Sequence, residues 1–417
     1  MSFVGTAVEN YSLILAALAA GAVWPSIFFP NVNPLSALVL SVSTFLVGML
    51  SQPLGAFAFG HYGDTRGRLF ALVFTLVTSG IGAVGIALTP GYVQIGIFGG
   101  VLIVIFRFLH GFGFGGEWGG ASTWITEQAS KSKWRAFWGS WVGQGQIIGA
   151  VVASATFVTL LGILGHAQFF AIGWRICFML GAAGLIIAAI ARYSFSETEI
   201  FMSMVARKKT LRMPAVRVLK EQWRLVLLLS LTAMSTSAAF FVLTTFASGY
   251  LAILGAPSAP LILGIVIAGI IAIFEVIGFM IIADKVGRKL VMLAGALAPA
   301  LMAFPFFILL NTKSSLFITI GVILLLLTTT VNTALATTWF SELFPSVYRF
   351  SGVGLSHSIG IFLGGGLAPL IAAALISSAG GAIQGWPYVS LMIVVYCAIS
   401  LLAIMFCPET KGIEMER

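Results

Sequence analysis

The chain is divided into long apolar segments that are separated by short charged breaks. Twelve of these segments reach the ~20 residues that an α-helix needs to cross the hydrocarbon core of a bilayer. They lack the strict alternation of barrel strands, and only helices and closed barrels satisfy every backbone polar group in lipid. The sequence therefore predicts an all-α membrane protein with spans near 10–30, 35–60, 69–89, 94–126, 136–164, 172–192, 223–252, 259–283, 289–310, 315–341, 351–378 and 386–407.

Composition supports a lipid-facing surface. Only 8% of the 417 residues are charged, whereas a soluble domain carries about 25%. The net charge of +9 does not indicate nucleic acid binding, because the positive charges are spread over the breaks. Cys177, Cys397 and Cys407 lie in or beside apolar segments and are interpreted as core residues. No disulfide framework, metal site or cofactor is expected, and no cleaved signal peptide, because no basic region precedes the first apolar run.

The basic residues are distributed unevenly across the membrane. A twelve-span topology places all but three of the 22 Lys and Arg residues on one side, together with both termini. Basic loops remain in the cytoplasm, so we expect a multi-pass protein of the cell (plasma) membrane with both termini cytoplasmic. The polar stretch at 193–222 separates an N-terminal six-helix bundle (1–192) from a C-terminal one (223–417). It is predicted to be a cytoplasmic linker along the inner membrane surface.

One charged pattern, Asp-x-x-Gly-Arg, occurs twice. It begins at Asp64 and at Asp284, the only two aspartates, about half of the 417-residue chain apart. The ends of the fourth and tenth spans repeat at nearly the same spacing, as Thr-Trp-x-Thr/Ser-Glu followed by an arginine. Such a duplication predicts two similar bundles with a site between them. We interpret the repeated charges as a cytoplasmic gate held by ion pairs: Asp64, Arg68, Glu127, Arg135, Asp284, Arg288, Glu342 and Arg349.

These motifs resemble the major facilitator superfamily over essentially the whole chain. Gly60–Arg68 is similar to its signature between spans two and three, and Arg107–Gly111 to its fourth-span motif. Gly111–Glu117 and Ser341–Pro345 resemble the metabolite:proton symporter group, and Pro408–Gly412 resembles the C-terminal motif of sugar porters. The resemblance implies the major facilitator fold, with two pseudo-symmetric six-helix bundles, and a conformational role for the two aspartates.

The chain departs from the family pattern at several positions. Thr65 stands where the signature has arginine, and His110 where the fourth span has glutamine. Gln52 replaces the arginine of an Arg-Pro-x-Gly motif, and the first span reads Glu9-Asn10-Tyr11-Ser12 without its usual final acid. These changes fall near the expected cavity and gate, so the resemblance leaves the substrate and its coupling open.

The fourth span carries three candidate functional residues. Arg107 lies deep within it, where a charge is costly and usually functional. It could bind an anionic substrate through its planar fork or tune proton release by a nearby acid, and a structural ion pair is the alternative. At about 100° per residue, His110 and Glu117 lie on nearly the same side of the helix, with Arg107 close to both. They could line a path for protons or substrate, or be a packing histidine and an acid held by an arginine.

Glu275 is a second acid embedded in a span, with no basic residue near it in sequence. Such a group favours its neutral form in an apolar setting and could load and release a proton, or stay protonated and donate one hydrogen bond. Amide side chains within spans could bind a polar substrate or bridge helices. The predicted substrate or proton-coupling residues are Arg107, His110, Glu117, Glu275, Gln52, Gln144, Gln146 and Asn332.

The sequence as a whole predicts a secondary active transporter that works by alternating access, and no enzyme. We expect a proton-coupled symporter of a small organic anion. The alternatives are a uniporter or symporter of a neutral sugar or polyol, a proton-coupled drug-efflux antiporter, a channel, and a polytopic membrane enzyme. An enzyme would show clustered His, Asp or Cys at one membrane face, and the sequence has no such cluster. The expected partners are the substrate, protons and the bilayer, with no nucleic acid, and the chain is expected to be a monomer.

Overall fold

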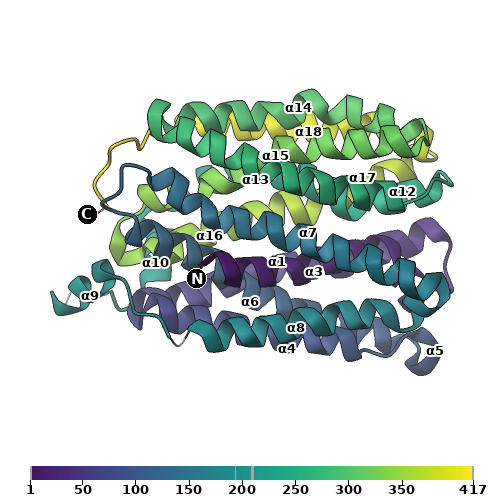
Figure 1. The fold of residues 1–417 in the computed structure, drawn as a ribbon, viewed down its shortest axis with the longest axis horizontal. Coiled ribbons are helices and arrows are strands. Elements are labelled where there is room, and N and C mark those ends of the chain that lie inside the picture. Colours follow the sequence, from purple (N-terminus) through teal and green to yellow (C-terminus); the bar gives the residue numbers. More distant parts are fainter. Residues whose placement is uncertain (1, 193, 208–210, 416–417) are drawn as a thin grey trace.

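The computed structural model describes residues 2–192, 194–207 and 211–415, and the regular structure within these ranges is helical (Figure 1). Eleven helical segments are long and apolar enough to cross a membrane. The longest, Arg135–Arg192, leaves helical geometry at Gly165 (φ 71°) and turns back, so the segments make twelve crossings. The predicted all-α membrane fold is confirmed.

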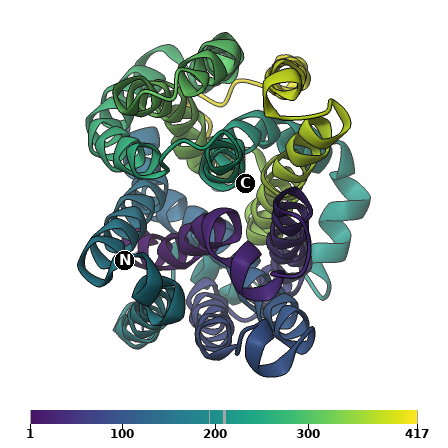
Figure 2. The same ribbon diagram turned by 90° about the vertical axis from the view of Figure 1, so that its right-hand side faces the viewer.

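The first six crossings form one group of helices, drawn purple to teal in Figure 2. Local signals fix some of their ends: Asn33 accepts a hydrogen bond from the backbone N–H of Ser36 at 2.9 Å and is followed by Pro34, a favoured residue in a first helical turn. The crossings are α1 (Ser2–Ala22), α3 (Pro34–Thr65), α4 (Arg68–Leu88), α6 (Phe98–Gln128), α7 (Arg135–Gln168) and α8 (Trp174–Arg192), with short helices α2 (Trp24–Phe28) and α5 (Tyr92–Ile95) between them.

The last six crossings form the second group, drawn green to yellow beside the first in Figure 2. Two of these crossings contain a π-helical turn, at Val242–Phe246 and at Phe362–Gly366. The helices are α11 (Trp223–Phe241) with α12 (Ala247–Ile253), α13 (Ala259–Val286), α14 (Arg288–Asn311), α15 (Ser315–Leu343), α16 (Arg349–Ile361) with α17 (Leu367–Ser378), and α18 (Ala382–Phe406).

The first span begins at Ser2, well before the expected position 10. Its first turns carry polar residues, including Thr6, Glu9 and Asn10, which lowered the hydropathy of this stretch. All three side chains are buried against other helices, so they do not face lipid. Local hydropathy therefore underestimates a helix whose polar face is covered by protein.

Between the two groups lies the polar stretch with α9 (Glu199–Ala206) and α10 (Pro214–Glu221). Residues 193 and 208–210 of the predicted linker lie outside the described ranges. Both helices lie at the same end of the molecule as the last described residues of the chain (Figure 1), and we call this the linker end. Helix α10 contacts α3 of the first group and α16 of the second.

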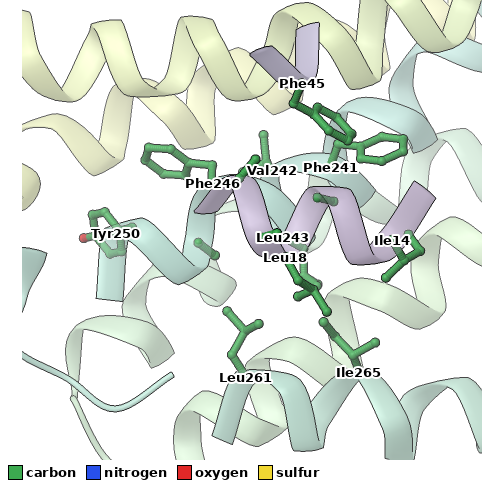
Figure 3. Packing of buried hydrophobic residues seen from close by; sticks show 14 of the residues in the cluster. Ile14, Leu18, Phe45, Phe241, Val242, Leu243, Phe246, Tyr250, Leu261 and Ile265 are labelled. Carbon is green, nitrogen blue, oxygen red and sulfur yellow. The ribbon is translucent and has the colours of Figure 1, made fainter. Parts of the chain in front are cut away.

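The two groups meet along their length. Near the linker end, α6 and α16 approach so closely that a Cβ on Gly119 would lie 2.5 Å from the Cα of Gly354, which only glycine permits. Towards the opposite end, Ile14 and Leu18 of α1 lie beside Leu243 and Ile265 of the second group (Figure 3). Apolar packing there and close backbone contact near the linker end join the two groups at both levels.

Candidate functional site

The repeated charges converge at the linker end, and we call the eight predicted gate residues the linker-end charge cluster. In its first part, Arg68 pairs with Asp64 at 2.6 Å and with Glu127 at 3.3 Å. Arg349, from the second group of helices, pairs with the same Glu127 oxygen at 2.9 Å. All four side chains are buried, so Glu127 joins the two groups through a desolvated ion pair.

The second part repeats this arrangement with the groups exchanged. Arg288 pairs with Asp284 and with Glu342, each at 3.1 Å. Arg135, from the first group, pairs with the Glu342 carboxylate at 2.9 Å. Glu342 therefore holds an arginine of its own group and one of the other group, as Glu127 does.

Each aspartate also caps a helix of the opposite group. Asp64 accepts hydrogen bonds from the backbone N–H groups of Phe350 and Ser351 at 3.2 and 2.9 Å, in the first turn of α16. Asp284 accepts from the N–H groups of Ala136 and Phe137 at 3.0 and 3.1 Å, in the first turn of α7. A helix N-terminus has unpaired N–H groups and a positive dipole end, so a carboxylate there is stabilising.

The glycine of each Asp-x-x-Gly-Arg pattern permits the turn between two spans. Gly67 has φ 124° and Gly287 has φ 119°, conformations that side-chain-bearing residues rarely adopt. The turn lets the arginine begin the next helix while pairing with the aspartate that ends the preceding one.

The structure adds a third repeated pair that the sequence reasoning missed. Glu197 accepts from the N–H of Leu69 at 3.0 Å, and Glu409 accepts from the N–H of Lys289 at 2.9 Å, so each covers the start of a span. The residue that follows each of these glutamates also contacts the cluster. Thr198 donates its hydroxyl to Glu127, and Thr410 donates its hydroxyl to Glu342. The signal was present as Ser-Glu-Thr after the sixth span and Pro-Glu-Thr after the twelfth, at nearly the spacing of the other repeats.

The carboxylate of Glu409 is held in its charged form. Partial burial acts to raise its pKa, but the N–H groups of Arg288, Lys289, Lys411 and Thr410 outweigh burial and lower the pKa below its usual value of 4.5. An ionised acid over the first turn of α14 is what the helix dipole favours.

A cavity of about 80 Å³ lies between the two groups of helices. On the linker-end side the lining residue His357 stacks on Trp118, with 3.5 Å between ring centres. On the other side Phe241 lies 5.5 Å from Phe45, again between groups. The central cavity therefore lies between the linker-end charge cluster and the contacts of α1 with the second group.

The central cavity is mostly apolar, with a small set of uncharged polar side chains. Its described lining contains Asn10, Gln146, Asn332 and His357 but no Asp, Glu, Lys or Arg side chain. Asn10 donates to the backbone carbonyl of Gln146 at 2.6 Å, and Asn332 donates to that of Met292 at 2.9 Å. The Oδ1 atom of Asn332 has no partner within the described ranges. Hydroxyls come from the second group alone: Thr232, Thr236, Ser237, Thr329, Thr330 and Thr333.

Of the predicted substrate or coupling residues, Gln146 and Asn332 line the cavity. Glu275 lies one side chain away, where it accepts a hydrogen bond from Thr330 at 2.8 Å, and Thr330 is itself part of the lining. The Glu275 side chain is half-buried on α13. A carboxyl in this position is connected to the cavity through one hydroxyl.

Arg107 and His110 lie together inside the first group, outside the cavity lining. Nη1 of Arg107 is 3.3 Å from Nδ1 of His110, and its guanidinium lies 5.0 Å from the ring centre of Phe45. Both side chains are buried, and Nε and Nη2 of Arg107 have no partner in the described part of the chain. Phe45 and Phe241 thus lie between the cavity and a guanidinium with two unpartnered nitrogens.

Glu117 is engaged elsewhere. Arg192, in the last turn of α8, forms a two-pronged ion pair with its carboxylate, and Thr75 donates to it at 3.0 Å. Nearby, Glu9 accepts from Ser79 at 2.6 Å, and its second oxygen has no described partner. The geometry matches the alternative of an acid held by an arginine, and that arginine lies 75 residues away in sequence, where local reasoning could not identify it.

Of the two remaining amides, Gln144 bridges two helices, whereas Gln52 bonds within its own helix α3. Gln144 of α7 donates to the carbonyl of Ile273 at 2.9 Å, and Gln52 donates to the sulfur of Met49 at 3.0 Å. Neither lines the cavity. The described residues include no group of three or more His, Cys, Asp or Glu side chains that could hold a metal ion.

Comparison with known proteins agrees with this architecture. Residues 10–357 match the Major Facilitator Superfamily. The chain is 34% identical to the inner membrane metabolite transport protein YhjE of Escherichia coli K12, over 98% of this chain and 93% of that protein. It is 30% identical to the shikimate transporter of the same organism, over 98% and 94%. Among solved structures, the proton:xylose symporter XylE aligns with a TM-score of 0.77 and 17% identity, covering 100% of this chain and 96% of that one, which supports the fold alone.

Proposed function

The chain belongs to the major facilitator superfamily and is a membrane transporter of metabolites, and we propose that it carries a small organic acid together with a proton by alternating access. Proteins similar to it include a shikimate transporter and proline/betaine transporters, whose named substrates all contain a carboxylate. That chemistry supports an acid as the cargo.

The observation that carries the proposal is the position of the central cavity. It lies between the two groups of helices and takes lining side chains from both. A site placed between two halves is exposed to one side or the other when the halves rock. Its volume of about 80 Å³ suits a small metabolite better than a drug, whose sites usually measure ~300–1,000 Å³.

The neutral lining supports a cargo without net charge. Transfer of an isolated carboxylate into a mostly apolar, uncharged site costs several kcal/mol because water is lost. A carboxylate that enters with one proton is neutral as a pair and avoids this cost. Amide donors such as Asn10 and hydroxyl donors such as Thr330 then provide hydrogen bonds to the acid and its other polar groups.

Glu275 is the proton carrier that the geometry favours. His110 lies away from the cavity, and Glu117 is neutralised by Arg192, whereas Glu275 reaches the lining through Thr330. A carboxyl hydrogen-bonded to a cavity hydroxyl responds directly to what the cavity contains. Arg107, shielded by Phe45, is proposed to meet the substrate carboxylate when the aromatic pair separates.

The proposal also gives the protein an orientation in the membrane and two parts that move relative to each other. The basic linker end is proposed to face the cytoplasm, in the cell's inner membrane. Residues 1–192 and 223–417 are proposed to rock as two bodies about the 193–222 linker in a monomer. The linker-end charge cluster is then the cytoplasmic gate.

Uptake into proteoliposomes tests the proposal. With an inward proton gradient, a panel of carboxylates should include one that accumulates, and the external medium should become more alkaline as it enters. Glu275→Gln should abolish accumulation while leaving substrate exchange across the membrane. Accumulation that persists in this variant would remove Glu275 as the proton site, and a panel without any proton-linked acid uptake would contradict the function.

A neutral polyol or sugar is the second candidate. The six hydroxyls that the second group contributes to the cavity favour it, because polyhydroxylated ligands exchange hydrogen bonds with such groups. Polyols in the same uptake panel decide between the two, since their transport without external alkalinisation would identify a uniporter.

A further inference from the structure

A second cavity, of about 570 Å³, opens at the linker end beside the charge cluster. One wall comes from the first group of helices, through the turn between α6 and α7. The other comes from the second group, through the ends of α13 and α14 and the C-terminal segment. The lining residues are Ser130, Lys131, Ser132, Lys133, Arg135, Asp284, Arg288, Lys411, Gly412, Ile413, Glu414 and Met415.

The lining is strongly basic. It holds three lysines and two arginines against two acids, Asp284 and Glu414. The arginines are bound to the cluster carboxylates, so the lysines supply the available charge. Lys131 lies 3.6 Å from Glu199 in a pair that is more than 80% exposed on both sides, an arrangement worth little in water. Lys133 and Lys411 are exposed as well.

The cavity also has a buried polar group left unsatisfied. Arg135 is 8% exposed and donates to Glu342, to the Ile413 carbonyl at 3.0 Å and to the Ser130 carbonyl at 2.8 Å. Its Nε has no partner in the ranges that the structure describes. A buried N–H without an acceptor costs about 1–3 kcal/mol, so this lining arginine has one hydrogen-bond donor still unused.

We propose that this second cavity binds a phosphate-bearing anion that bridges the two groups of helices and holds the linker end closed. Lysine ammonium groups, an arginine N–H and serine hydroxyls are the donors that phosphate oxygens accept. Lys131 and Lys133 belong to the first group and Lys411 to the second, so the full site exists only while the two are together. A ligand that binds one conformation shifts the population towards it.

The shared chemistry has two sources, a lipid headgroup and a soluble phosphate. Basic pockets between helices at the cytoplasmic surface attract anionic headgroups, at about fivefold in affinity per basic residue. Soluble phosphate could reach the same cavity from water. The inference is independent of the transported substrate, because none of these residues lines the central cavity.

The test measures linker-end closure of the full chain in phosphatidylcholine nanodiscs. Spin labels at the exposed positions Trp138 and Val286 report the distance between α7 and α13. One arm adds phosphatidylglycerol to the lipid, and the other adds inorganic phosphate to the buffer. In at least one arm the closed fraction should rise, and the arm that responds identifies the source.

Matched triple variants make the test specific. Lys131→Gln/Lys133→Gln/Lys411→Gln should weaken the response by about fivefold for each lysine removed. Arg207→Gln/Arg212→Gln/Lys220→Gln removes the same charge from exposed linker positions and should respond as the wild type does. The inference is overturned if neither addition closes the wild type, or if the two triple variants respond alike.

Discussion

The linker-end charge cluster and the central cavity lie in the same interface but differ in symmetry. Every charged residue of the cluster has a counterpart in the other group, down to the glutamate that each threonine contacts. The cavity has no such correspondence, since all six of its hydroxyls come from the second group. The repeat is retained where both groups make the same closing contact and is lost where one asymmetric molecule must be bound.

Because the cluster is symmetric and the cavity is not, substitutions in these two regions should have different effects. A substitution in the cluster should alter which end is open, and one in the cavity should alter what is bound.

Glu127→Gln should strongly favour an open linker end. Glu127 pairs with Arg68 and Arg349, and removing one charge of a buried network costs about 3–5 kcal/mol because the remaining charges stay desolvated. Cysteine accessibility of the cavity from the linker-end side should rise, and gradient-driven accumulation should fall. Glu342→Gln should act equally, because its contacts are the counterpart.

The control for these two glutamate variants is Glu221→Gln, which breaks an exposed ion pair with Arg217. Such a pair contributes about 0–1 kcal/mol, so accessibility should not change. A large effect of only one of the two glutamate variants would show that the cluster is symmetric in geometry but not in energy.

Thr198→Val and Thr410→Val should give smaller openings of the linker end. Each removes one hydroxyl that donates to a buried carboxylate, worth about 1.5–3 kcal/mol, while preserving side-chain shape. Accessibility measurements read the effect, and Thr78→Val, whose exposed hydroxyl bonds only within its own helix, is the control. Thr198 also accepts from the N–H of Phe201 at 3.2 Å, so Thr198→Val can have the larger effect, and an absence of opening in either variant would refute the equivalence of the third repeated pair.

Asn332→Ala should act on cargo without opening either end. Asn332 lines the cavity and its Oδ1 has no partner in the described ranges, and a neutral hydrogen bond contributes about 1 kcal/mol, roughly fivefold in KM. Transport kinetics measure this change. A variant with normal KM but altered accessibility would place Asn332 in the gating machinery.

Acid pH should weaken the cap of Glu409 slightly. Its pKa is lowered in the folded protein, so the stabilisation is complete above the usual value of 4.5 and is lost as pH falls through the lower folded value. The thermal unfolding temperature of the wild type should therefore fall on acidification by slightly more than that of Glu409→Gln. Parallel pH curves for the two proteins would contradict this role, and the exposed position of Glu409 keeps the effect small.

The sequence predicted the fold and the membership of the cluster because both depend on patterns along the chain. Twelve spans followed from apolar length, and the gate residues followed from a repeat that needs no knowledge of contacts. The Glu-Thr pairs that begin at positions 197 and 409 are repeated in the same way. They were not predicted, because one lies in the polar linker and the other near the end of the chain.

The cavity could not be predicted in the same way. Whether a side chain faces a cavity or a neighbouring helix depends on helix rotation and on distant partners. Arg192 forms an ion pair with Glu117, and Phe45 separates Arg107 from the cavity. His357, which the sequence did not indicate as a candidate, lies in the lining. A charged residue within a span therefore predicted an interaction, but it did not indicate whether the side chain lines the central cavity.

Paired distance measurements test the separation of gate and cargo most directly. Spin labels at Trp138 and Val286 report the linker end, and labels at the exposed Val32 and Ile253 report the opposite end. Glu127→Gln should lengthen the first distance, whereas Asn332→Ala should leave both distances unchanged and raise KM. A linker-end distance that does not respond to Glu127→Gln, or that responds equally to Asn332→Ala, would show that opening and binding are not controlled by separate regions.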